Sequence, residues 1–210
     1  GTRPSYYDDI CHRTMLIYTR QALHHHLSTA ALLFISLFPV SAHCEGWSYK
    51  EVRSDPGQFA LGFVGGIIAH ELGHYVVATS ITYPGANFTP ADQLQVASAG
   101  FQTQWLMTEL ALRDSNFRER KKAPGNIGAG IVVAHLGITA AYLVYLKDHR
   151  QGDVVGMADA TGLTNNQIAL ALAIPGALDA WRLFGNDVPK WVPGVSLMWK
   201  GMGLAWVWAY

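Results

Sequence analysis

Four apolar runs, each with few charged residues, alternate with polar segments between residues 59 and 210. Each run has about 18–23 residues, enough for a helix to cross a hydrocarbon layer of roughly 30 Å. The pattern therefore predicts an all-α membrane protein, a polytopic helical bundle of about four membrane segments. The four runs are residues 59–81, 126–146, 167–184 and 191–210.

A fifth apolar stretch, residues 96–112, differs because it contains Gln102, Gln104 and Glu109. Polar side chains of this kind favour a segment buried in protein, so we interpret the stretch as re-entrant. The short pieces Phe88–Thr89 and Leu94–Val96, just before and at its start, are compatible with a small β-hairpin.

The N-terminal part of the chain has the features of a leader. Leu27–Val40 is an apolar core of about 14 residues, followed by small residues at Ser41 and Ala42. Residues 1–42 are thus predicted to be a signal peptide or a retained anchor. Residues 43–57 are polar and predicted to be a short extracytoplasmic segment, and residues 58–210 to be one membrane-embedded domain.

Composition and charge narrow the class of protein. Hydrophobic residues make up 50% of the chain and charged residues 14%, and 15 basic residues balance 15 acidic ones. A balanced charge gives no basic field for nucleic acid. The densest basic segment is Arg113–Lys122, which the positive-inside rule places in the cytoplasm. We expect an integral protein of a bacterial inner (cytoplasmic) membrane.

The first apolar run contains the motif His70-Glu71-Leu72-Gly73-His74. On a helix, His70 and His74 lie one turn apart on one face and can bind one metal ion, while Glu71 can act as the general base on a bound water. A soluble zinc-protease helix would carry charges on its outer face, and this run has none. The alternative is a packing helix with two hydrogen-bonded histidines and a buried glutamate.

A third ligand must come from elsewhere in the chain. Asp179 follows Pro175 and Gly176 in an apolar run and is the best candidate, although Arg182 at i+3 offers an ion pair instead. His135 and Glu109 remain open as further candidates. Gly62 and Gly66 form a GxxxG pair that predicts close helix packing near the motif.

Three pieces in order resemble the site-2 protease family of intramembrane zinc metalloproteases. They are His70–His74, the small-residue segment Ala97–Gly100 and the segment Ile174–Ala180, in which Ala180 replaces the family's glycine. The resemblance covers roughly residues 59–184. It implies that His70, His74 and Asp179 bind Zn²⁺ and that Glu71 is the base.

The function that follows from the resemblance is zinc-dependent hydrolysis of a peptide or membrane-protein substrate within or beside the lipid bilayer. The alternative is a non-catalytic membrane protein that keeps the metal site for structure or regulation.

Overall fold

The protein is described by a computed structural model that covers residues 46–82, 87–113, 124–185 and 188–209. Within these ranges the chain is helical and contains no β-strand, which confirms the predicted all-α class. The predicted leader, residues 1–42, lies outside the described residues. The helices are α2 (Tyr49–Val52), α3 (Pro56–Ile81), α4 (Pro90–Arg113), α5 (Asn126–Val144), the 3₁₀ turn η1 (Leu146–Asp148), α6 (Asp153–Thr161), α7 (Asn165–Phe184) and α8 (Trp191–Ala209).

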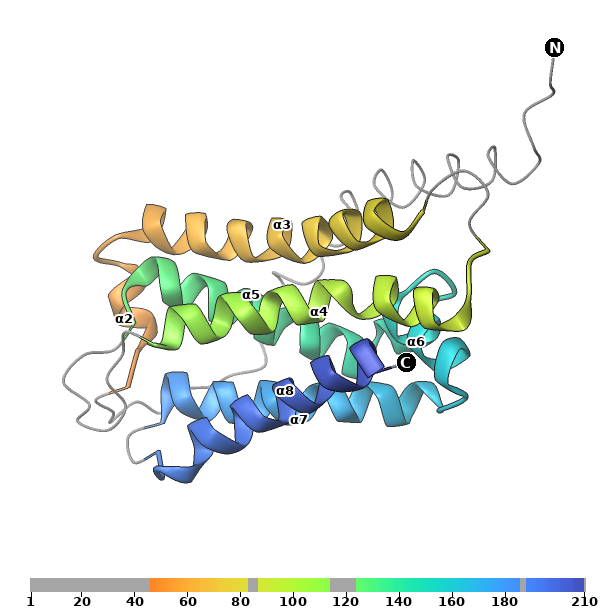
Figure 1. The fold of residues 1–210 in the computed structure, drawn as a ribbon. Helices are drawn as coiled ribbons and strands as arrows, with labels where there is room; N and C mark the ends of the chain where they lie inside the picture. Colours follow the sequence, from red (N-terminus) through yellow and green to blue (C-terminus); the bar gives the residue numbers. More distant parts are fainter. Residues whose placement is uncertain (1–45, 83–86, 114–123, 186–187, 210) are drawn as a thin grey trace, which may run out of the picture.

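The long helices form a bundle in three layers (Figure 1). Helix α3 lies on one side of a layer formed by α4 and α5, and α7 and α8 lie on the other side. The short helix α6 lies at one end of the bundle, where α3 and α5 end and α4 and α7 begin. We call this end the site end, because the candidate site described below lies toward it.

Three of the helices are long and apolar enough to cross a membrane: α3, α5 and α7. They correspond to three of the four predicted segments. The fourth, α8, is not among them, so the predicted count of four is not confirmed. Lys200 lies in the middle of α8 and is buried in ion pairs rather than exposed to lipid.

The structure of α4 differs from two sequence-based predictions, the re-entrant segment and the β-hairpin. It is one continuous helix of 24 residues, about 36 Å long, that runs beside α3 and α5 instead of turning back as a re-entrant segment. Leu94–Val96 belong to this helix and not to a hairpin strand. The reason is that its polar side chains, such as Gln104 and Thr108, are buried against neighbouring helices, so no return to the surface is needed.

The bundle also constrains the membrane topology. The Asn126 amide at the start of α5 donates hydrogen bonds to the backbone oxygens of Glu51 and Asp55, beside the start of α3. Residues 46–57, the end of α4 at Arg113 and the start of α5 at Asn126 therefore lie at the same end of the bundle. The described residues that flank the basic segment are thus at the end that holds the predicted extracytoplasmic segment, so the two segments cannot be assigned to opposite sides of a membrane.

The two faces of α3 differ sharply. Its buried positions are Gly62, Gly66, His70 and Gly73. Its opposite face exposes large apolar side chains at helical spacing, which on a membrane protein is the face expected against lipid. These side chains are Leu61, Val64, Ile68, Leu72, Tyr75 and Val76.

The glycines of α3 permit the closest helix contacts in the bundle. A Cβ atom added to Gly62 would lie 2.0 Å from the Ile127 carbonyl oxygen, and one added to Gly66 would lie 2.9 Å from the Ala134 Cβ. From the other side, a Cβ at Gly130 would lie 2.3 Å from the Phe59 carbonyl oxygen. The predicted GxxxG packing is thus confirmed, with α5 as the partner helix.

We predict that Gly62→Ala destabilises the protein, because the added methyl group must displace the α5 backbone. Overpacking of this kind costs about 1–3 kcal/mol. Thermal unfolding of the detergent-purified chain would measure the loss. Gly65→Ala is the matched control, since a Cβ there meets nothing within 4 Å. Equal unfolding temperatures for the two variants would show that the α3–α5 contact is less close than described.

Candidate metal centre

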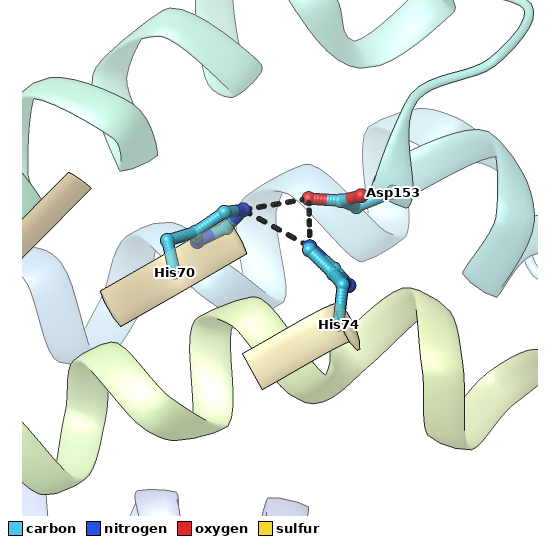
Figure 2. Close-up of side chains that lie close together, drawn as sticks. All are labelled: His70, His74 and Asp153. Carbon is cyan, nitrogen blue, oxygen red and sulfur yellow. Dashed lines mark hydrogen bonds and ion pairs between the residues drawn. The ribbon is translucent and has the colours of Figure 1, made fainter. Parts of the chain in front are cut away.

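His70 and His74 lie one turn apart on the buried side of α3, as the motif predicts. Their Nε2 atoms are 3.2 Å apart, and their rings meet edge to face at a centroid distance of 4.8 Å. Both side chains point toward α6 (Figure 2). The two histidines are therefore placed as a pair of ligands would be.

The third member of the group is Asp153, the first residue of α6. Its Oδ2 atom lies 3.0 Å from His70 Nε2 and 3.3 Å from His74 Nε2. Figure 2 shows the three side chains converging on one point from two elements far apart in the sequence. Among the described residues, this is the one group of three or more potential ligands close enough to bind a single ion.

The triangle of ligand atoms fits a metal ion better than hydrogen bonds alone. Two ligand atoms at the usual 2.0–2.2 Å from a tetrahedral zinc are about 3.3 Å apart, and the three edges here are 3.0, 3.2 and 3.3 Å. Each histidine can place at most one proton on Nε2, and the carboxylate supplies none when ionised. The available protons therefore cannot form a hydrogen bond along each of the three edges, whereas one cation can contact all three ligand atoms.

Contacts around His74 fix the tautomer that a metal ligand requires. Its Nδ1 atom donates a hydrogen bond to the Val96 carbonyl oxygen at 2.6 Å. A neutral imidazole with its proton on Nδ1 presents a lone pair on Nε2, which is the atom that faces Asp153. The backbone of α4 thus orients His74 toward the group.

Gly100 of α4 leaves the space beside the histidines. A Cβ atom at this position would lie 2.4 Å from His74 Nε2 and 2.6 Å from both His70 Nε2 and Cε1. Gly73 likewise allows α4 to pack closely against α3, since a Cβ at this position would lie 2.3 Å from Thr103 Oγ1. Helix α4 can therefore approach the ligand atoms closely only because these two positions carry no side chain.

The charge of Asp153 is favoured by its surroundings. Burial alone would raise the pKa of this carboxyl, but the adjacent His74 and His70 together hold it well below its usual range. The backbone N–H of Asp153 also donates to the Tyr142 hydroxyl at 3.3 Å, which ties the start of α6 to α5. A buried carboxylate that stays ionised is a suitable ligand for a cation.

Asp179, the ligand predicted from sequence, is engaged elsewhere in the structure. Its Oδ1 atom accepts hydrogen bonds from Arg182 at 2.9 Å and from Ser196 at 3.0 Å, and its Oδ2 atom accepts one from Lys200 at 2.6 Å. The alternative considered from sequence, the Asp179–Arg182 ion pair, is therefore present. The structure brings Asp153, and not Asp179, to the two histidines.

The other two open candidates also belong to this second cluster. Glu109 accepts hydrogen bonds from both Arg182, at 2.6 and 3.0 Å, and Lys200, at 2.9 Å. His135 is fully buried, with Nε2 3.6 Å from Asp179 Oδ2. We call Glu109, Asp179, Arg182 and Lys200 the ion network; its formal charges cancel.

Glu71 lies beside His70 on α3 and is half-buried. This placement is compatible with the base role that the motif predicts, and that role stays a prediction.

The sequence does not identify Asp153 as a candidate ligand, because the stretch that contains it has the pattern of a polar loop. Residues 147–166 contain three aspartates and three glycines, with no apolar period strong enough to mark a helix. The available local signal was Gly152-Asp153 before Val154 and Val155, an acidic residue at a helix start. Nothing in that signal points to α3.

No family model, curated protein or solved structure matches this chain. The site-2 protease resemblance therefore rests on the motifs alone, and the function must be argued from the site.

We predict that Asp153→Ala removes metal binding by the purified chain. The two remaining histidine ligands leave an incomplete site, so less than a tenth of the wild-type metal content is expected by elemental analysis. Asp159→Ala, on the exposed side of the same helix, is the control and should bind as wild type. If Asp179→Asn also abolished binding while the fold was retained, the ion network would have to be reconsidered as part of the site.

We also predict that Gly100→Ala prevents metal binding without breaking the bundle. The methyl group would occupy the space next to both Nε2 atoms, while alanine is a better helix former than glycine. Metal content and circular dichroism would be measured on the same sample. Gly201→Ala on α8, where a Cβ meets nothing within 4 Å, should change neither. A Gly100→Ala protein with full metal content would contradict the close approach of α4.

Proposed function

We propose that this protein is a zinc-dependent peptidase that acts within or beside a membrane. The observation that carries the proposal is the convergence of His70, His74 and Asp153 at zinc-like separations on a helix whose outer face is apolar. Two imidazoles and a carboxylate form a common ligand set of catalytic zinc, in which the fourth position is left for water or substrate.

The chemistry would be divided between the metal and Glu71. A bound zinc ion would polarise a peptide carbonyl and lower the pKa of a coordinated water toward 7. Glu71 accepts a proton from the attacking water and returns it to the leaving amine. His74 is held for its ligand role by the Val96 carbonyl, and Asp153 supplies a negative charge that helps to retain the cation.

The position of the site along α3 supports a substrate that lies in or next to the bilayer. His74 is seven residues before the end of α3, which corresponds to about 10 Å along the helix axis. A metal centre at that depth is close to one surface of a membrane spanned by α3, where water and an unfolded peptide segment are available. A substrate helix would have to unwind there, because its amides are otherwise bonded internally.

We predict that Glu71→Gln keeps the metal and loses hydrolysis. Removal of a general base lowers the rate about 10²–10⁴-fold. The assay would use zinc-loaded, detergent-purified protein with a dye-quenched unstructured protein substrate, and metal content would be measured in parallel. Glu51→Gln, on α2 at the opposite end of the bundle, is the control.

Two results would contradict this proposal. Hydrolysis by the Glu71→Gln protein at the wild-type rate would remove the glutamate from the mechanism. A wild-type protein that binds one zinc ion and cleaves no unfolded peptide would favour the alternative, a membrane protein with a structural or regulatory metal site.

A further inference from the structure

Several buried polar atoms next to the metal centre have no hydrogen-bond partner among the described residues. They belong to side chains of three helices that pack together, α3, α4 and α5, and each side chain is at least nine-tenths buried. The atoms are His70 Nδ1, both amide atoms of Gln104, Thr108 Oγ1 and His135 Nε2.

The packing of α4 against α5 places two of these side chains at the same height. The helices are antiparallel, and a Cβ at Gly128 would lie 3.5 Å from the Ala111 Cβ. Moving seven residues toward the site end along each helix reaches Gln104 on α4 and His135 on α5. Seven residues are close to two full turns, so both residues also return to the facing sides.

The packing of α3 against α5 places His70 at that height too. These helices are parallel, and Gly62 lies against Ile127. Eight residues further along each helix are His70 and His135. The atoms of His70, Gln104 and His135 that lack a hydrogen bond therefore come together at one level of the bundle.

Gln104 also lies on a continuous stripe of α4. Gly100, Gln104 and Thr108 follow one another at intervals of four residues, on one side of the helix. Gly100 adjoins the two histidine ligands. At the level of Gln104, His135 Nε2 lies 3.6 Å from Asp179 Oδ2, so this level adjoins the ion network.

We propose that buried water occupies this level of the bundle and connects the metal centre to the ion network. Buried polar groups are nearly always hydrogen-bonded, and an unpartnered set of this kind indicates an internal water site. Water suits both the donors and the acceptors present. A second cation is disfavoured, because Lys200 and Arg182 already neutralise the carboxylates nearby.

The water has a defined role in the proposed function, on which this part of the inference rests. A histidine that binds a metal through Nε2 normally donates its Nδ1 proton to a carboxylate, a carbonyl oxygen or water. His74 has the Val96 carbonyl for this purpose, whereas His70 has no such partner among the described residues. Water held by Gln104 accepts a hydrogen bond from His70 Nδ1–H and thereby orients the imidazole ring. The same water is a local source of water for a site surrounded by apolar helices.

The first test is zinc affinity of the full chain in detergent, measured by competition with a chelator. Gln104→Leu preserves size but cannot hold the water, and loss of such a partner weakens metal binding about 10–100-fold. The control is Gln102→Leu, which removes an amide from the same helix that is bonded to Ser98 instead. Wild-type zinc affinity in a folded Gln104→Leu protein would overturn the role of the water.

The second test does not depend on the metal. An experimental structure that resolves ordered water should show a water oxygen within hydrogen-bonding distance of His70 Nδ1 and of Gln104 or His135. A direct hydrogen bond between His70 and Gln104, with no water at this level, would overturn the inference. If wild-type protein binds no zinc, the proposed function fails, and this second measurement still decides whether the water is present.

Discussion

The close approach of α3 to α4 and α5 is the constraint on which the rest of the structure depends. A lone helix can present His70 and His74 on one side, but it cannot bring a third ligand to them. Gly62 and Gly66 let the α5 backbone come within contact distance, and Gly73 and Gly100 do the same for α4. Absent side chains on the inner face of α3 therefore create the space in which ligand atoms meet.

This arrangement also explains why polar and charged groups can be buried in so apolar a bundle. Two carboxylates and two cations of the ion network come from three helices, and each group contacts at least two others. An unpaired charge at such a position would be costly, while a paired and hydrogen-bonded set is tolerated. Glu109 accepts bonds from both Arg182 and Lys200, so this carboxylate has the partners that a buried charge requires.

Sequence reasoning succeeded where the information is local. The HExxH spacing predicts two facing histidines, and the Gly62–Gly66 pair predicts close packing. Three of the four predicted membrane segments are helices long and apolar enough to span a membrane. It did not find Asp153, because that residue is brought to α3 only by the path of α5 and α6. It also treated residues 96–112 as re-entrant, because their polar side chains indicate burial in protein but do not reveal that one continuous helix provides it.

The choice between the two aspartates is decided by their neighbours and not by their motifs. Asp179 lies in an apolar helix and resembles a ligand, yet Lys200 and Arg182 already balance its charge. Asp153 lies in a polar stretch, yet within the described chain its ion-pair partners are only His70 and His74. The two imidazoles beside Asp153 each present Nε2 to its carboxylate, so the three side chains form a group that could hold a cation. The neighbours of the two carboxylates thus make Asp153 the candidate ligand and leave Asp179 to join α7 to α8.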